Sequence, residues 1–318
     1  MARFDVFNGD ADGICALQQI RLAEPGESTL VTGVKRDIAL LERVRAGAGD
    51  EVTVLDISLD KNRAATERLL EAGARVRYFD HHYAGEIPEH PGLLVRIDPS
   101  PTRGTSLLVD DYLGGRFRAW AVVGTFGDNL DQSARQAAQP LGLAEEALER
   151  LRELGILLNY NAYGEQVSDL HVAPDELFRR VHPYADPLAF IAADPTFDRL
   201  RAGHAEDRAR AEAVRPAVAT DRGAVYVLPA ESWARRVSGV FANDLARGTP
   251  GRAHALLTRL AEGGFVVSVR APLAAPVGAD ALCRQFPTGG GRQAAAGVNR
   301  LPEDLYDEFL RRFAEAFG

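Results

Sequence analysis

The sequence has few cysteines, no long apolar run and a deficit of basic residues. Its only two cysteines in 318 residues, Cys15 and Cys283, lie far apart and form no CxxC pair, which argues against a disulfide scaffold or a zinc site. No apolar run approaches the roughly 20 residues that a membrane-spanning helix needs. The N-terminus shows no sequence of the secretory type, so we expect a soluble, cytoplasmic protein that does not bind membranes.

The charge balance limits the partners. With 37 Lys and Arg against 45 Asp and Glu, the formal net charge is −8, which disfavours a surface that coats nucleic acid, because such binding depends on clustered cations. A phosphate partner should therefore be small or be met by a local basic patch. The length of 318 residues, with 46% hydrophobic and 26% charged residues, is typical of a globular chain with two domains.

In the first half of the chain, short β-rich runs alternate with amphipathic helical stretches, a pattern that favours a parallel sheet covered by helices. The expected strands are Phe4–Phe7, Leu30–Gly33, Val52–Ile57, Val76–Asp80 and Leu93–Ile97. The expected helices between them are Gly13–Leu22, Ile38–Arg45 and Lys61–Ala72. From Ala119 to Leu200 the sequence reads as mostly helical.

A second α+β pattern follows a charged stretch, Thr196–Thr220, that reads as an exposed joining helix. Its expected strands are Ala224–Leu228, Ala255–Leu260 and Phe265–Val269, and its expected helices are Trp233–Arg247 and Glu303–Phe317. We therefore divide the chain into a first domain (1–195), a helical linker (196–222) and a smaller second domain (223–318).

The tract NGDADG places Asn8, Asp10 and Asp12 two residues apart behind the first strand. If the chain stays extended there, the three side chains point to one side and converge, which calls for a positive partner. The alternative is a polar loop that caps the helix from Gly13 onward, because Asn, Gly and Asp are turn residues.

Further acids and histidines lie where other runs end. Asp56 follows Val52–Leu55, Asp80-His81-His82 follows Val76–Phe79, and Asp128 follows the apolar run Val122–Gly127, which we also place at the edge of the sheet. Capping of a following helix explains Asp56 or Asp128 taken alone. Together, oxygen ligands and imidazole at the carboxyl edge of a parallel sheet favour Mn²⁺ or Mg²⁺ over zinc.

The sequence resembles the DHH phosphoesterases, a family named for the Asp-His-His seen here at 80–82. Its four motifs match NGDADG, the strand-end Asp56, FDHH and TFGDN, and GGGRQAAAG at 289–297 resembles the glycine-rich signature of the DHH-associated C-terminal domain. The resemblance implies an α/β fold: a parallel-sheet domain with flanking helices, a helical linker, and a smaller α+β substrate-binding domain. It places the active site in the cleft between the two domains.

The resemblance also implies a centre of two Mn²⁺ ions, with Mg²⁺ or Co²⁺ as alternatives. Asp56 would bridge both ions, Asp10 would serve the first, and Asp12, His81 and Asp128 would serve the second. Two ions about 3.5–4 Å apart activate a water and neutralise charge on the phosphoryl oxygens. His82 would face the substrate phosphate, with Asp80 holding an imidazole in place, so His82, Asp80 and Asp56 are the expected catalytic residues.

The glycine-rich tract offers positive partners for a phosphate. Backbone N–H groups at Gly289, Gly290 and Gly291 can approach an anion closely, and Arg292 can grip two phosphate oxygens. Arg270 resembles another phosphate-binding Arg of this domain. Arg103 is a third candidate, although an Arg in a solvated loop explains it as well.

The chain departs from the family pattern at three places. The family usually has His where Arg292 stands, which puts the shape or charge of the substrate in question. Val6 occupies the place where many members have His, and Asn8 the place where RecJ-type exonucleases have Asp. Because Asn8 offers only a neutral oxygen, we expect the first ion to bind more weakly than usual.

Two weaker features remain. The stretch Leu158–Gly164 concentrates aromatic and amide side chains that either bind a nucleotide base or pack a helix, and packing is the simpler explanation. The other histidines, at 90, 171, 182, 204 and 254, have no ligand-like spacing, so we expect surface or core positions for them.

The leading hypothesis is a metal-dependent phosphoesterase that hydrolyses a small nucleotide-like phosphodiester: a short oligoribonucleotide, a dinucleotide or a nucleoside bisphosphate. The expected partners are therefore a small phosphate or nucleotide substrate or a short single-stranded oligonucleotide, and a homodimer is left open. One alternative is hydrolysis of pyrophosphate or polyphosphate. The other is a nucleotide-binding protein with weakened catalysis.

Overall fold

The computed structural model describes residues 1–318 and divides into two compact units, Met1–Ala202 and Gly203–Gly318. The division falls inside helix α9 (Pro195–Glu212), which occupies the first part of the stretch that the sequence predicts as a joining helix. Each unit is described below by itself.

The first unit is built on a five-stranded, all-parallel sheet with the strand order β2-β1-β3-β4-β5. The strands are β1 (Arg3–Phe7), β2 (Thr29–Val31), β3 (Glu51–Leu55), β4 (Arg75–Asp80) and β5 (Leu93–Ile97). Their apolar residues lie on both faces, as in parallel sheets that are covered by helices on each side. All five expected strands are confirmed within two residues at each end.

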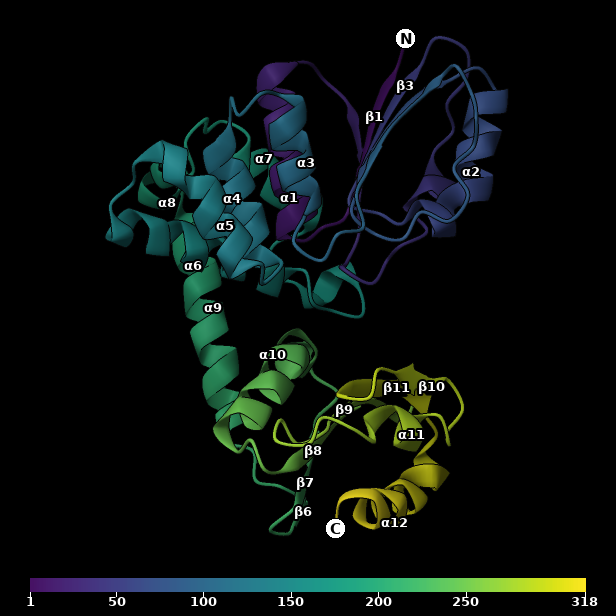
Figure 1. Cartoon of the computed structure of the whole chain (residues 1–318), viewed down its shortest axis with the longest axis vertical. Coiled ribbons are helices and arrows are strands. Elements are labelled where there is room, and N and C mark those ends of the chain that lie inside the picture. The colour runs from purple at the N-terminus through teal and green to yellow at the C-terminus, as the bar shows by residue number, and fades with distance from the viewer. The chain divides into compact units, whose positions relative to one another are not determined.

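Helices cover both faces of this sheet. Figure 1 shows α1 (Ala11–Ala23) and α3 (Thr105–Tyr112) on one face and α2 (Leu59–Glu71) on the other. Helix α1 is buried from Ala11 to Arg21, because α3, α4 and α6 surround the side that does not face the sheet. The stretch Ile38–Arg45, predicted as a helix, forms only the short 3₁₀ turn Leu40–Arg43; Leu40 and Leu41 are still buried against α2.

The rest of the first unit is a helical layer, as the sequence predicts. Its helices are α4 (Arg118–Gly127), α5 (Asp131–Ala138), α6 (Glu145–Asn161), α7 (Pro174–Val181) and α8 (Pro187–Ala193), with 3₁₀ turns at Gln139–Leu141 and Val167–Asp169. The prediction that Val122–Gly127 leads to the edge of the sheet as a strand is wrong, because this run lies within α4. It is apolar throughout because α4 packs against α1, α5 and α6.

The second unit carries a six-stranded mixed sheet with the order β10-β11-β9-β8-β7-β6. Its strands are β6 (Val218–Ala219), β7 (Gly223–Leu228), β8 (Ala253–Arg259), β9 (Phe265–Arg270), β10 (Gly289–Gly291) and β11 (Ala295–Leu301). Only β7 and β8 run parallel to each other. Its helices are α10 (Ser232–Gly248), α11 (Ala279–Cys283) and α12 (Tyr306–Phe317), the last preceded by a 3₁₀ turn at Glu303–Leu305.

The two faces of this second sheet bury separate cores. Phe309, Phe313 and Phe317 of α12 pack with Val267 and other strand residues, while Trp233 and Phe241 of α10 pack in a second cluster. The expected α+β fold is confirmed, including both helices that the sequence predicts there.

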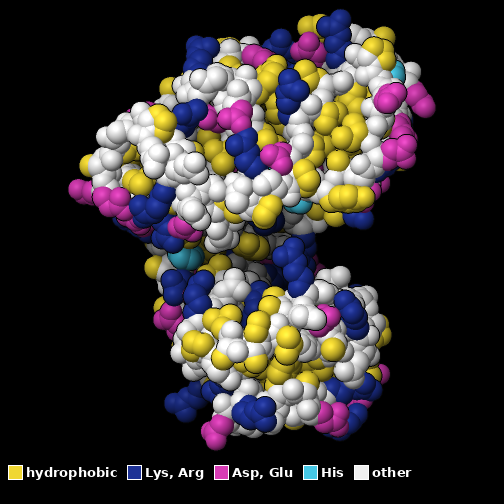
Figure 2. Space-filling model, in the orientation of Figure 1, with side chains coloured by type: hydrophobic (Ala, Val, Ile, Leu, Met, Phe, Trp, Pro, Cys, Tyr) yellow, Lys and Arg dark blue, Asp and Glu magenta, His cyan; other side chains and the backbone are white.

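None of the helices is both long and apolar enough to span a bilayer. On the face of the first unit that Figure 2 shows, acidic and basic side chains are interspersed.

Candidate metal centre

The carboxyl ends of β3 and β4 bring Asp56 and His81 together. The Nε2 atom of His81 lies 3.3 Å from Oδ1 of Asp56, which also accepts a hydrogen bond of 3.1 Å from the hydroxyl of Thr105. Asp56 has a left-handed backbone conformation with φ of 61°, while its N–H still pairs with the carbonyl of Phe79. Such a conformation in a residue other than glycine costs of the order of 1–3 kcal/mol and is concentrated at functional sites.

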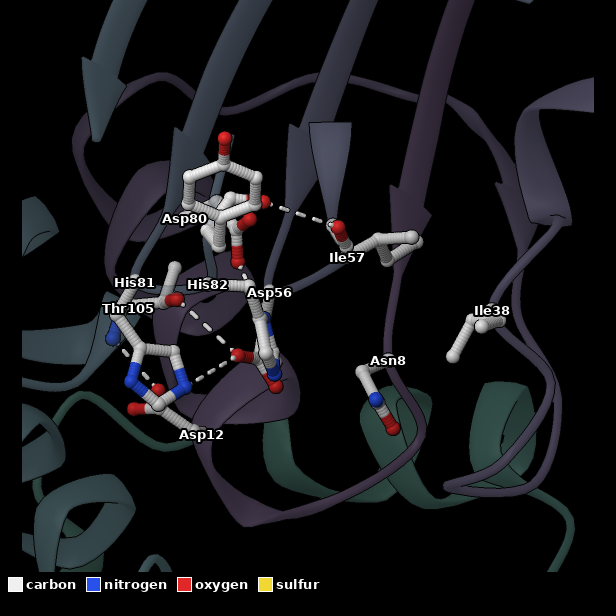
Figure 3. A network of polar contacts seen from close by, with 12 residues as sticks. Asn8, Asp12, Ile38, Asp56, Ile57, Asp80, His81, His82 and Thr105 are labelled. Atoms are coloured by element: carbon white, nitrogen blue, oxygen red, sulfur yellow. Dashed lines mark hydrogen bonds and ion pairs between the residues drawn. The ribbon is translucent and has the colours of Figure 1, made fainter. Parts of the chain in front are cut away.

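Asp12 and Asp128 complete a cluster around His81. One ligand atom each from Asp12, His81 and Asp128 lies within 4.8 Å of the others, and Oδ2 of Asp128 is 3.4 Å from Nε2 of His81. One ligand atom each from Asp56, His81 and His82 also lies within 4.8 Å of the others. Figure 3 shows Asp12, Asp56 and His81 directed toward one another, with Asn8 to one side.

Asp12 is also the N-terminal anchor of α3. Its two carboxylate oxygens accept hydrogen bonds from the backbone N–H groups of Thr105 (2.6 Å) and Ser106 (2.9 Å). Asp12 lies in the first turn of α1, which begins at Ala11. The tract NGDADG therefore does not continue as an extended segment; the helix, not strand alternation, sets the direction of Asp12.

Asp128 reaches the cluster from the end of a helix. Asn129 has φ of 60°, its N–H donates to the carbonyl of Phe126, and that of Leu130 donates to the carbonyl of Thr125. These two bonds are the Schellman motif, which ends a helix at a left-handed residue. The sequence predicts that Asp128 lies near the other acids, which it does, but it assigns Asp128 to the end of a strand and not to the end of helix α4.

Burial and mutual repulsion disfavour the charged forms of Asp56 and Asp128. Burial, with the nearby charges of Asp10 and Asp12, raises the pKa of Asp56 well above its usual value and that of Asp128 to about 6. Burial alone would lower the pKa of His81, but its bond to Asp56 and the surrounding carboxylates raise it to about 10. The group therefore favours a cation in its midst.

The donor set fits a hard divalent ion. Carboxylate oxygens of Asp12, Asp56 and Asp128 with one imidazole, and no thiolate, are the ligands that Mn²⁺ and Mg²⁺ accept. Both cysteines are free and buried. Asp12, Asp56, His81 and Asp128 would hold such an ion.

His82 is oriented by Asp80. Nδ1 of His82 lies 2.7 Å from Oδ1 of Asp80, whose carboxylate is fully buried, while the imidazole is 46% exposed. The rings of His81 and His82 lie 4.5 Å apart between centroids. Nε2 of His82 is thus left for a ligand at the edge of the cluster.

Lys35, which is not among the site residues that the sequence predicts, enters the same group of acids. Its ammonium forms an ion pair with Asp10, lies 3.4 Å from Oδ1 of Asp128, and donates to Oδ1 of Asn159 at 3.0 Å. Burial alone would lower the pKa of Lys35, but Asp10 and Asp128 raise it well above its usual value. Lys35 follows β2, so its place after a strand of the parallel sheet was the signal that could have found it.

Asp10 and Asn8 lie on the Lys35 side of the site. Asp10 is the N-cap of α1 and accepts from the N–H of Gly13 at 3.1 Å, as the capping alternative predicts, in addition to its ion pair with Lys35. The side-chain amide of Asn8 donates to the backbone carbonyl of Lys35 at 3.2 Å. Oδ1 of Asn8 is buried and has no hydrogen-bond partner.

The second unit places the glycine-rich tract in a hairpin. A Cβ atom at Gly289 would come within 1.8 Å of the carbonyl of Cys283, and one at Gly291, where φ is 139°, within 2.5 Å of the Cα of Ala296. These two glycines are therefore required by packing. A Cβ at Gly290 would meet nothing within 4 Å.

The three candidate phosphate-binding arginines differ in their surroundings. Arg292, at the end of the hairpin, is exposed, and its guanidinium has no hydrogen bond or ion pair. Arg270 donates through Nε to Oδ1 of Asn243 at 2.8 Å. Arg103, in the first unit, pairs with Asp111 and lies 3.7 Å from Asp98, as expected of an Arg held in a surface loop.

The stretch Leu158–Gly164 mainly packs a helix. Its first four residues form the end of α6, where Tyr160 and Asn161 are buried. Two polar side chains face Lys35, however: Asn159 accepts its hydrogen bond, and the ring of Tyr163 lies 5.8 Å from its ammonium.

No protein-family model matches the chain, and no curated protein does either. Solved structures do. The structure of exonuclease RecJ bound to manganese is 21% identical in sequence to this chain and has a TM-score of 0.64. The alignment covers 99% of this chain and 90% of that one. The DHH domain of a member of a ribosomal-protein family is 14% identical with a TM-score of 0.65, covering 99% of this chain and 86% of that one.

A third similar structure is a pGpG-specific phosphodiesterase from Vibrio cholerae. It is 12% identical with a TM-score of 0.57, and the alignment covers 99% of both chains. The two-part DHH fold that the four motifs and the glycine-rich tract predict is therefore confirmed.

Proposed function

We propose that this chain, which has the DHH fold, is a metal-dependent phosphoesterase that hydrolyses a small nucleotide-like phosphodiester. The observation that carries the proposal is the convergence of Asp12, His81 and Asp128 within 4.8 Å of one another, beside Asp56 in its left-handed conformation. Helix capping does not explain why several buried carboxylates and one imidazole lie so close together. We infer that this group binds a divalent cation.

The chemistry follows from the surroundings of that cation. An ion bound there would activate water and withdraw charge from the phosphoryl oxygens. Asp56 accepts a hydrogen bond from Thr105, and the N–H groups at the start of α3 fix Asp12, so both carboxylates are oriented before any ion binds. His82, oriented by Asp80, offers Nε2 to a phosphoryl oxygen or to the leaving group.

The substrate class rests on charge and on the second unit. The net charge of −8 and the mixed charges on the face of the first unit that Figure 2 shows suit a compact anion better than a long polynucleotide. The similar structure of a phosphodiesterase specific for pGpG supports a short substrate of the dinucleotide kind. We propose that the exposed Arg292 and the open space beside the Cα of Gly290 receive one of its phosphates.

One second candidate is favoured by a specific observation. The ammonium of Lys35 occupies part of the carboxylate group, which reduces the room for cations, so a nucleotide-binding protein with weak catalysis would have the same site. Hydrolysis of pyrophosphate or polyphosphate is the runner-up within the enzyme class, because the same ion and arginine would serve an anhydride.

The proposal is tested by turnover on a panel with added Mn²⁺, Mg²⁺ or Co²⁺. The panel holds a linear dinucleotide, a short oligoribonucleotide, a nucleoside bisphosphate, pyrophosphate and polyphosphate. We expect metal-dependent release of mononucleotide from the dinucleotide. Binding without turnover would favour the second candidate, and turnover of the anhydrides alone would favour the runner-up.

A matched pair of variants ties turnover to the cluster. Asp128→Asn removes a carboxylate that would hold the ion, and we expect it to lower turnover by orders of magnitude. Asp131→Asn, three positions along, removes an exposed carboxylate that pairs with Arg152 at the surface, and should leave turnover unchanged. Equal activity of the two variants at saturating metal would contradict the proposed centre.

A further inference from the structure

The ammonium of Lys35 lies among three side-chain oxygen atoms, two of which belong to the acidic group. Its ammonium pairs with Oδ2 of Asp10, donates to Oδ1 of Asn159 at 3.0 Å, and lies 3.4 Å from Oδ1 of Asp128. An ammonium has three N–H donors, so these oxygens account for all of them. The side chain is 30% exposed, which is low for a lysine.

The backbone of Lys35 is fixed as well. Its N–H donates to the carbonyl of Ala162 at 3.0 Å, and its own carbonyl accepts from the side-chain amide of Asn8 at 3.2 Å. Lys35 is thus held by the end of β1 on one side and the end of α6 on the other. These contacts fix the position from which its side chain enters the acidic group.

Asp128 divides its two oxygens between two positive partners. Oδ2 faces His81 at 3.4 Å, in the cluster that fits a divalent ion, while Oδ1 faces Lys35 at 3.4 Å. Asp10, by contrast, belongs to neither group of residues that brings three ligand atoms together. Its Oδ2 pairs with Lys35 instead.

We propose that the ammonium of Lys35 takes the place of a second divalent ion, so that this site binds a single ion. The inference rests on the proposed function only in that it assumes the ion at Asp12, His81 and Asp128. Asn8 is then a positioning residue that holds Lys35 through its backbone, and not a ligand.

The charges agree with this arrangement. Asp10, Asp12, Asp56 and Asp128 form one group of four buried or nearly buried carboxylates. A divalent ion and an ammonium together offset most of that charge. A second divalent ion beside the ammonium would be repelled by it at short range, where burial leaves little solvent to screen the repulsion.

The number of bound ions tests the proposal without reference to turnover. The full chain is freed of metal, titrated with Mn²⁺ and analysed by metal content after gel filtration and by electron paramagnetic resonance. We expect about one tightly bound Mn²⁺ per chain, with the hyperfine pattern of an isolated ion and not of an exchange-coupled pair.

Two variants of the same side chain sharpen the test. Lys35→Met keeps the length of the side chain and removes its charge, so we expect a second Mn²⁺ to bind at Asp10 and Asp56 and the spectrum to show coupling. Lys35→Arg keeps the charge and should still bind one ion. Arg36→Met removes the neighbouring exposed cation, which has no ion pair, and should leave the count at one.

The outcomes separate this inference from the proposed function. Two coupled ions in the wild-type chain, or a single ion in Lys35→Met, would overturn the role of Lys35 while leaving a phosphoesterase in place. A wild-type chain that binds no Mn²⁺ would overturn both. The wild-type count needs no variant, so it decides the question even where Lys35→Met does not fold.

Discussion

The buried carboxylate of Asp80 holds the imidazole of His82 at 2.7 Å and leaves the opposite ring nitrogen toward solvent. A ring fixed in this way loses little freedom when it meets a substrate, and its tautomer is set by its partner. The pair therefore offers a test of the chemical step that does not disturb the ion.

We predict that His82→Ala and Asp80→Asn lower turnover while leaving the bound metal unchanged. For Asp80→Asn we expect a loss of about tenfold to a hundredfold, the range for residues that orient a functional histidine. Tyr83→Ala is the control, because Tyr83 is the next residue and its side chain is largely exposed. Loss of metal in His82→Ala would place His82 among the ligands instead.

A second prediction concerns Gly290. Alanine fits there because a Cβ would meet nothing within 4 Å, so Gly290→Ala should fold and melt like the wild type. If a phosphate lies against this backbone, the added methyl group displaces it, and we expect KM to rise about tenfold or more, as for loss of a charge-assisted hydrogen bond. A normal KM would mean that the glycines serve only the packing of the hairpin.

Arg292→Ala tests the phosphate contact through charge. The guanidinium has no ion pair in the protein to lose, so stability and metal content should not change. A contact of this kind contributes about 1.5–3 kcal/mol, so KM for a substrate with a terminal phosphate should rise by roughly 10- to 150-fold. Arg300→Ala, in the neighbouring strand, removes an arginine that pairs with Glu262, and its KM should be unchanged.

A fourth prediction separates two roles of Asn8. Asn8→Asp removes the donor to the carbonyl of Lys35 and places a carboxylate there, so we expect a lower melting temperature without metal. If Asn8 only positions Lys35, added Mn²⁺ should raise the melting temperatures of both proteins by the same amount. A larger rise in Asn8→Asp would show that the new carboxylate binds the ion.

A fifth prediction concerns acid stability of the second unit. Burial, together with the charge of Arg252, lowers the pKa of His254 to about 4, against 6.5 for an unperturbed histidine. Because the neutral ring is the form that folds, its contribution to stability is present above pH 6.5 and is lost as the pH falls toward 4. We expect His254→Gln to lose less stability than the wild type between neutral pH and about pH 5, measured by urea unfolding. If the stability of the two proteins falls equally with pH, groups other than His254 determine the acid stability of this unit.

The parallel strands could be predicted because each is a short apolar run. Asp56, Asp80 and His81 could be expected to lie near one another because they follow two such runs at one edge of the sheet. Val122–Gly127 has the same appearance, yet it forms helix α4, because a helix that is buried on all sides shows no amphipathic period. The acid after it, Asp128, still arrives at the cluster. Its position depends on where the helix ends, at Asn129, and not on the type of element.

The only sequence signal for Lys35 is its place after β2, which does not by itself distinguish a site residue. A single lysine in a turn carries no spacing that distinguishes it from a solvated side chain, and its partners Asp10, Asp128 and Asn159 lie far apart in the sequence. Only the packing of α6 beside the loop after β2 brings them together. The packing of α12 was easier to predict, because its phenylalanines recur at helical spacing.

The two hydrogen bonds from the start of α3 to Asp12 can report whether the proposed ion is bound. Each oxygen that would touch an ion already accepts a backbone N–H, from Thr105 or from Ser106. A cation that draws electron density from the carboxylate must weaken both bonds, and the chemical shifts of these two amide protons should move with occupancy. Titration of the isotope-labelled protein with diamagnetic Mg²⁺ can thus be read from the start of one helix, with no substrate added.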